Sequence, residues 1–131
     1  MFDTVLRVFA DDFDVESFLA SVDLGVPSEA FKKGENDVLG NPNPDSGFDA
    51  LVSESEDLVA HLDEIRVFLA KNAQSLTSLK AKQVTAILDM GFTVGADEQF
   101  AQSIKLPADL LGELHQLNIS VEISAYPGSQ Q

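Results

Sequence analysis

The stretch TVLRVFADDFDVESFLASVDLG, residues 4–25, sets the beginning of the fold. Its first part, residues 4–10, is rich in β-branched and aromatic side chains and ends at a pair of acids, which is typical of a strand. Asp14 stands where a side-chain oxygen can cap a helix, and the apolar residues after it recur on one helical face. Gly25 predicts the end of that helix. A strand followed directly by a helix is therefore expected.

The next segment, residues 26–47, carries three prolines and three glycines. These residues favour turns, because proline presets its own φ and glycine accepts a positive φ. A long loop is therefore predicted here, with short strands near residues 30–33 and 48–53.

A long helix is predicted after this loop. Large apolar side chains recur every three to four residues from Leu58 to Leu79, as on the stripe of a helix that packs against a sheet. Ser53 and Glu56 stand at the spacing of a capping box, so the helix is expected to begin near Ser55.

The rest of the chain predicts three strands and one helix. Residues 83–92 have the composition of a strand, and residues 100–106 that of a shorter one. Pro107 is expected to be the first residue of a helix that ends at Asn118. Apolar and polar side chains alternate over residues 120–126, which describes a half-buried strand.

These elements follow the order β-α-β-β-α-β-β-α-β. Short links between strands, together with crossovers through helices, favour an α+β fold in which about three helices cover one face of a mainly antiparallel, mixed sheet. At 131 residues and 44% hydrophobic content, the chain fits a single domain. That domain is expected to span residues 1–126 with a long loop at 26–47, and residues 127–131 are expected to form a flexible C-terminal tail.

The charge is distributed unevenly along the chain. Residues 1–64 hold sixteen acids and three bases, a net charge of −13, and the remainder carries −1 of the total of −14. A surface of one sign attracts a basic partner and repels nucleic acid and anionic lipid. We therefore expect a basic protein partner, and neither nucleic acid nor a membrane.

The sequence also bears on the compartment. It contains no cysteine, so disulfides and thiolate metal sites are excluded, which suits a reducing compartment. The N-terminus has an acid at position 3 and only a short apolar stretch, unlike a secretory signal. Nowhere do about 18 apolar residues run together, as a membrane span would need. A soluble, cytoplasmic protein is expected.

One acidic cluster matches a calcium loop only in part. Asp12, Asp14 and Glu16 occupy its positions 1, 3 and 5, but the glycine required at position 6 is missing. Capping of the helix that follows accounts for these acids better, because carboxylates are favourable at a helix N-terminus.

A second pattern involves a histidine. Asp57, His61 and Glu64 lie at i, i+4 and i+7 on one predicted helix face, but a lone histidine makes a weak zinc site. We expect an exposed His61 and no metal. Nucleophile and phosphate-binding motifs such as G-x-S-x-G, S-x-x-K, G-x-G-x-x-G and the P-loop are also missing from the sequence. No catalytic residue, cofactor or enzyme activity is therefore predicted.

Three segments together resemble a bacterial family, the domain of unknown function 4279: LRVFADDFDVESFLASVDLGVPSEAFKKGE (6–35), FDALVSES (48–55) and PADLLGELHQLNISVEISAY (107–126). The shared pattern is a strand, an acidic helix start, a proline and a basic-glycine-acidic segment, here residues 33–35. An aromatic residue, often tryptophan, opens the family's middle strand, where this chain has Phe48. The resemblance implies this fold and a bacterial origin, and some relatives look like immunity genes beside toxins.

The leading hypothesis is a non-enzymatic acidic binding module. Its specific form is an immunity protein that neutralises a basic toxin by covering the toxin's active cleft, because carboxylates can stand in for phosphates and pair with arginine. The predicted partner-binding residues are acids expected to share one rim of the sheet: Asp11, Asp12, Asp14, Glu16, Asp45, Asp49, Glu54, Glu56 and Asp57.

Two alternatives stay open from the sequence. A small-molecule-binding domain or small enzyme would use a pocket between the sheet and the helices, with Phe31, Phe48, Phe92 and Phe100 as its lining. Alternatively, the charge serves solubility only. The oligomeric state and the identity of the partner are left open.

Overall fold

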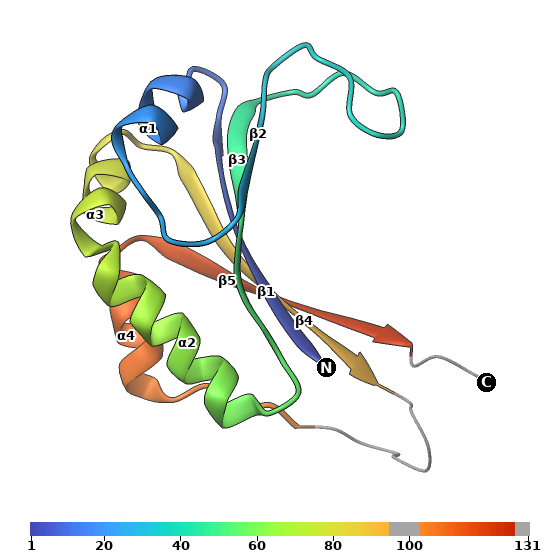
Figure 1. Cartoon of the computed structure of the whole chain (residues 1–131), viewed down its shortest axis with the longest axis vertical. Helices are drawn as coiled ribbons and strands as arrows, with labels where there is room; N and C mark the ends of the chain where they lie inside the picture. The colour runs from blue at the N-terminus through green and yellow to red at the C-terminus, as the bar shows by residue number, and fades with distance from the viewer. Residues whose placement is uncertain (95–102, 128–131) are drawn as a thin grey trace.

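A computed structural model describes residues 1–94 and 103–127 of the chain (Figure 1). The elements in chain order are β1 (Phe2–Ala10), α1 (Val15–Ser21), β2 (Ser28–Phe31), β3 (Ser46–Ser55), α2 (Leu58–Lys71), α3 (Ala73–Ala81), β4 (Thr85–Val94), α4 (Ala108–Gln116) and β5 (Ile119–Pro127).

The strands form one sheet in the order β2-β3-β1-β4-β5. Every neighbouring pair is antiparallel except β4 and β5, which are parallel and are joined through α4. The helices that the structure describes all lie on one side of this sheet (Figure 1). The predicted fold class, an α+β fold with a mixed sheet and its helices on one face, is confirmed.

The central strand β1 shows how the sequence separates the two faces of the sheet. Phe2, Thr4, Leu6 and Val8 are buried on the helix side, and the residues between them point to the opposite side. This alternation follows from the period of two in a strand. Pairing with β3 and β4 continues the apolar rows across the sheet, so that one layer of side chains fills the space under the helices.

Aromatic packing fixes α1 on the sheet. The rings of Phe18 on α1 and Phe48 on β3 are stacked with their centroids 5.5 Å apart, and Phe13 packs at a tilt against both. As the sequence predicts, Asp14 caps the helix: its side chain accepts a hydrogen bond from the backbone N–H of Ser17 at 3.2 Å. These contacts explain why the chain reverses directly after β1.

The predicted long helix is two helices, and Asn72 separates α2 from α3. The side chain of Asn72 is buried and its Nδ2 donates hydrogen bonds to the carbonyl oxygens of Leu24 and Phe68, both at 3.0 Å. The bond to Leu24 ties the break to the chain that leaves α1. Because this partner lies 48 positions away in the sequence, the apolar periodicity gave no sign of the break.

The predicted capping box at the start of α2 is wrong. Asp57 is the cap, and its Oδ2 accepts a hydrogen bond from the N–H of Ala60 at 2.9 Å. Ser53 lies inside β3 instead, buried against α2. The sheet therefore extends to Ser55, where the sequence predicted the helix to begin.

The C-terminal part agrees with the sequence in most respects. Pro107 precedes α4 directly, and Asn118 ends that helix in the left-handed conformation with φ of 58°. The strand predicted at 100–106 is not observed over residues 103–106, and the rest of that prediction lies outside the described residues. The observed order is thus β-α-β-β-α-α-β-α-β.

The final strand β5 is less covered than predicted. Ile119 is buried, but Ile123 and Tyr126 are about half exposed, because β5 lies at the edge of the sheet. Of the predicted tail, residues 128–131 lie outside the described residues.

We predict that Asn72→Ala lowers the free energy of unfolding by about 1–3 kcal/mol, because two buried carbonyl oxygens lose their side-chain donor. Urea denaturation measures the change. Gln74→Ala, on the exposed face of α3, is the matched control and should stay within about 0.5 kcal/mol of the wild type. Equal effects of the two substitutions would show that the bridge to Leu24 does not hold the helices in place.

Candidate functional site

The side of the sheet away from the helices carries a mixture of charged and apolar residues, which we call the open face. On β1 it consists of Asp3, Val5, Arg7 and Phe9. Cross-strand partners extend it: Arg7 pairs with Asp49 on β3, and Val5 with Asp89 on β4. Carboxylates thus flank the single arginine at the centre of the sheet.

A hairpin-like turn, residues 34–43, projects from the end of this face, and we call it the overhanging hairpin (Figure 1). Its two sides are joined by backbone hydrogen bonds from Gly34 N to Asn43 O at 2.9 Å and from Asn43 N to Glu35 O at 2.8 Å. An isolated bridge joins Asn36 and Pro42. The predicted loop at 26–47 therefore contains β2 and an internally bonded turn.

Polar contacts also fix the base of the overhanging hairpin. Lys33 N donates to Ser46 Oγ at 2.9 Å, and Asn43 Nδ2 donates to Lys32 O at 3.1 Å. The ammonium groups of Lys32 and Lys33 form ion pairs with Glu16 and Asp11 respectively. The hairpin is thereby connected to both α1 and the end of β1.

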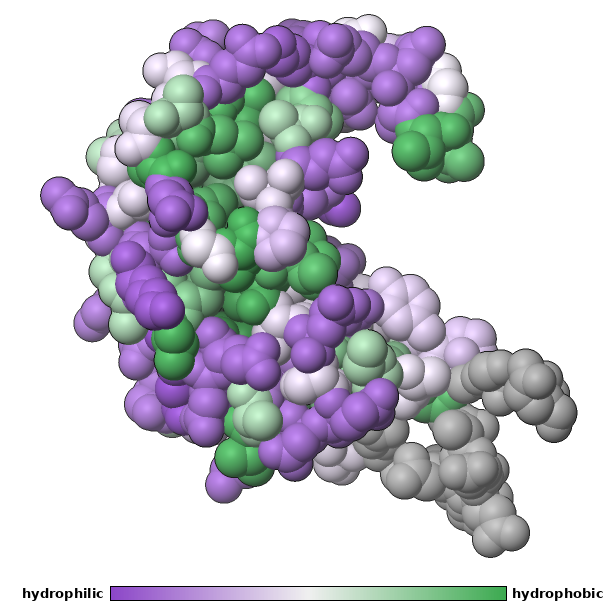
Figure 2. Space-filling view, in the orientation of Figure 1, coloured by the Kyte–Doolittle hydropathy of each residue, from purple (hydrophilic) through white to green (hydrophobic). Residues whose placement is uncertain are grey.

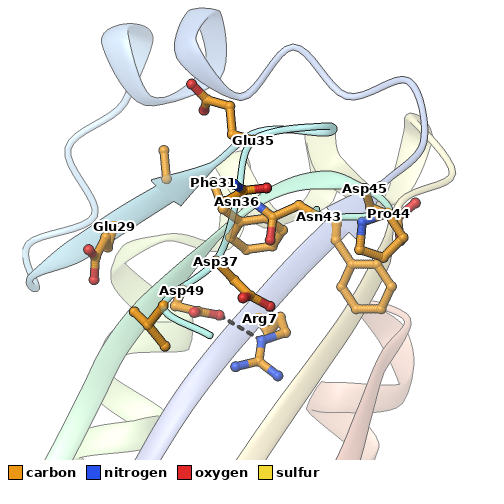
Figure 3. Close-up of a pocket in the computed structure, with 13 residues that line it drawn as sticks. Arg7, Glu29, Phe31, Glu35, Asn36, Asp37, Asn43, Pro44, Asp45 and Asp49 are labelled. Carbon is orange, nitrogen blue, oxygen red and sulfur yellow. Dashed lines mark hydrogen bonds and ion pairs between the residues drawn. The ribbon is translucent and has the colours of Figure 1, made fainter. Parts of the chain in front are cut away.

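Between the overhanging hairpin and the open face lies a cleft of about 650 Å³ (Figure 3). Its lining consists of Arg7, Phe9, Glu29, Ala30, Phe31, Glu35, Asn36, Asp37, Val38, Asn43, Pro44, Asp45 and Asp49. The space-filling view shows the hollow beneath the projecting hairpin (Figure 2).

The cleft is acidic. Five carboxylates line it against one cation, Arg7, whose Nε donates a hydrogen bond to Asp49 Oδ1 at 2.8 Å. That hydrogen bond is the main cause that raises the pKa of Arg7; burial opposes it, and the charges of Asp49, Asp89 and Glu122 add to it. Arg7 therefore stays charged and is engaged by one of the five acids, which leaves a formal excess of four negative charges.

The floor of the cleft is apolar. Phe9 and Phe31 provide aromatic surface, and Phe31 lies directly over Gly47 of the neighbouring strand β3. A Cβ atom at Gly47 would come within 2.8 Å of the Phe31 ring and 2.0 Å of the Val8 carbonyl oxygen. A glycine is required there because any side chain would displace the aromatic floor.

The structure divides the nine predicted acids among different places. Asp45 and Asp49 line the cleft. The group from Asp11 to Glu16 lies at the same end of the sheet, where Asp14 caps α1 and two other members pair with lysines.

The other three predicted acids, Glu54, Glu56 and Asp57, lie at the opposite end of β3. The register pairs Ala10 with Ser46 and Phe2 with Ser55, so a strand of about 30 Å separates the two groups. The prediction of one shared acidic rim is therefore wrong.

Three acids of the cleft were not singled out in the sequence: Glu29, Glu35 and Asp37. Glu29 lies on the short strand β2, and the other two belong to the overhanging hairpin. Their clustering depends on the hairpin folding back over the sheet. The only local signal was Asp37 followed by Gly40, a spacing typical of a turn.

The expectation of an exposed His61 is wrong, because its side chain is fully buried between α2 and the sheet. Its Nε2 lies 2.6 Å from Thr4 Oγ1, and its Nδ1 lies 2.9 Å from Ser53 Oγ. The hydroxyl of Ser53 donates to Glu64 Oε2 at 2.7 Å, so its oxygen accepts the proton of His61 Nδ1. Ser55 Oγ lies 3.1 Å from the same Nδ1. Burial lowers the pKa of His61 and favours the neutral ring, in which Nε2 accepts from the Thr4 hydroxyl.

This network is structural. Glu64 contacts Ser53 and not the imidazole, so the three groups lack the order of nucleophile, base and orienting acid that catalysis requires. Asp57, the first residue of the i, i+4, i+7 pattern, serves as the cap of α2. Within residues 1–94 and 103–127, no group of three or more potential ligands is arranged to hold a metal ion.

The four phenylalanines suggested as a pocket lining are placed differently. Phe48 and Phe92 belong to the core under the helices, and Phe31 lines the cleft on the opposite side of the sheet. Phe100 lies outside the described residues. A cavity between α3, β4 and β5 holds only about 10 Å³, roughly the space of one water molecule.

No family model matches the chain, and no curated protein or solved structure showed significant similarity to it. The resemblance to the domain of unknown function 4279 therefore stays a prediction. None of the helices described in the structure is long and apolar enough to cross a membrane.

The buried His61 predicts a pH dependence of stability. Burial lowers the pKa of His61 below its ordinary 6.5, although the charges of Glu64 and Asp3 act in the opposite direction. At a pH between the pKa of His61 in the folded state and its pKa in the unfolded state, the unfolded state binds more protons than the folded state. The contribution of the neutral His61 to the unfolding free energy is therefore fully present above about pH 6.5 and is lost as the pH falls through the folded pKa. Urea denaturation from pH 7.5 downward measures the loss.

His61→Gln is the control for this titration, because an amide keeps a donor and an acceptor but does not titrate. The variant should show a weaker fall in unfolding free energy than the wild type over the same pH range. Parallel curves for the two proteins would contradict a buried, neutral His61.

Proposed function

We propose that this protein is a non-enzymatic binding module whose acidic cleft takes a basic segment of a partner protein. The observation that carries the proposal is the cleft itself: five carboxylates and one arginine, already bonded to one of them, line a hollow of about 650 Å³. A basic segment would complement this charge, and charge complementarity raises the association rate and selects the partner.

The carboxylates of the cleft are largely available. Among the described residues, Glu29, Glu35, Asp37 and Asp45 take part in no ion pair, whereas Asp49 bonds to Arg7. Asp37 Oδ1 accepts two backbone N–H groups of the hairpin, so part of its charge is engaged. Binding of a cation would relieve the repulsion among these acids.

The specific form that we propose is an immunity protein acting in the cytoplasm, which takes a basic segment of a toxin into its own acidic cleft and thereby covers the toxin's active cleft. The resemblance to the domain of unknown function 4279 supports this form, since some members look like immunity genes beside toxins. The charge of −14 supports a protein partner over nucleic acid or an anionic membrane.

The volume of the cleft favours a second candidate, a small cationic molecule. Ligand pockets commonly measure about 300–1,000 Å³, and an aromatic floor beside carboxylates suits an organic cation. The cleft is the same in both cases. The two candidates differ in whether a protein or a small amine occupies it.

The proposal is tested by recovering partners from the host's lysate and secreted fraction with the tagged protein at low and at high salt. We predict a basic protein that is retained at low salt and lost at high salt. The double variant Glu35→Lys, Asp45→Lys should weaken binding of the purified partner by about tenfold or more, measured by calorimetry, because two attractive contacts become repulsive.

The matched control is Glu54→Lys, Glu56→Lys, which makes the same charge change at the opposite end of β3. It should bind nearly as the wild type does. A partner that tolerates the cleft substitutions but is lost with the control would contradict the proposed site. Recovery of no protein, together with stabilisation by a small amine, would favour the second candidate.

A further inference from the structure

The tip of the overhanging hairpin is apolar and open to solvent. Val38 is fully exposed and Leu39 is 82% exposed, the two highest values among the large apolar residues that the structure describes. Figure 2 shows an apolar patch at the end of the projecting loop, beside the hollow. Of the other exposed apolar residues, Val59, Val67 and Leu111 lie on helices, and Ile123 and Tyr126 lie on the edge strand β5. Scattered exposed apolar residues are common in soluble proteins.

Hydrogen bonds set the conformation of this tip. Asp37 Oδ1 accepts from Leu39 N and Asn41 N, both at 2.9 Å, and Gly40 N donates to Asp37 O at 3.0 Å. Gly40 has a positive φ of 84°, which glycine adopts without strain. The turn therefore holds two adjacent apolar side chains away from the core.

One side of the tip faces the cleft. Val38 is one of the lining residues, whereas Leu39 is not, and Phe9 and Phe31 line the same space from the sheet side. A segment lying in the cleft would thus contact apolar surface both above and below it. The acids Glu35 and Asp45 are also among the residues that line this cleft.

We propose that Val38 and Leu39 form an apolar anchor for the partner, so that the cleft recognises a basic segment that also carries a large apolar side chain. This inference rests on the proposed function and specifies its partner. Burying apolar surface adds affinity that does not depend on salt, whereas the carboxylates supply the salt-dependent part. The two contributions can therefore be separated by experiment.

The charge argues for this occupant over two others. A second copy of the chain would bring another charge of −14 against the acids that flank the tip. An anionic lipid surface would be repelled for the same reason. A segment that combines basic and apolar residues complements both the carboxylates and the anchor.

The test uses two short synthetic peptides of equal length and charge, one of alternating lysine and serine, and one with leucine in place of the central serine. Calorimetry at low salt measures their affinity for the full chain. We expect the leucine peptide to bind about tenfold more tightly. Val38→Ser, Leu39→Ser should abolish this difference.

Two controls support the comparison. Val59→Ser removes an exposed valine on α2, away from the cleft, and should change neither affinity. Because Val38 and Leu39 are exposed, their replacement should leave the thermal unfolding midpoint unchanged, which shows that the variant folds.

The outcomes separate this inference from the proposed function. Equal affinity of the two peptides for the wild type overturns the anchor but leaves the acidic cleft standing. If neither peptide binds the wild type, both the apolar anchor and the proposed acidic binding cleft are contradicted. If the leucine peptide still binds the Val38→Ser, Leu39→Ser variant more tightly than the serine peptide does, the anchor is also overturned. The anchor is overturned as well if the wild type self-associates and these substitutions abolish the self-association.

Discussion

The pairing of β1 with β3 on one side and β4 on the other is the constraint on which the rest of the structure depends. Leu6 and Val8 are fully buried under the helices, and Arg7 between them points to the open face. A slip of one residue would place the arginine in the core and both apolar side chains in solvent. The register therefore determines both what the helices cover and what lies in the cleft.

The same register explains how the negative charge is used. Antiparallel pairing sends the two ends of β3 to opposite ends of the sheet, so acids that are near in sequence separate in space. Lys32 and Lys33 engage acids around α1, and Arg7 engages Asp49. In the cleft, Glu29, Glu35, Asp37 and Asp45 are left without ion pairs among the described residues, and this concentrates the excess charge there.

Local signals predicted the elements that local interactions form. The cap at Asp14, the end of α4 at Asn118 and the alternation in β1 depend on neighbouring residues, and each could be predicted from the sequence. The break at Asn72 and the burial of His61 could not be. Both depend on partners far along the chain, Leu24 in one case and Thr4 in the other.

By itself, the sequence determined the fold class, most of the strands and helices, and the sign of the surface, because these follow from side-chain periodicity and composition. Only the tertiary structure decided which acids meet. Asp45 and Asp49 join Glu29, Glu35 and Asp37 because the chain between β2 and β3 bonds to itself and folds over the open face of the sheet. That arrangement depends on strand register and long-range contacts, which no periodicity encodes.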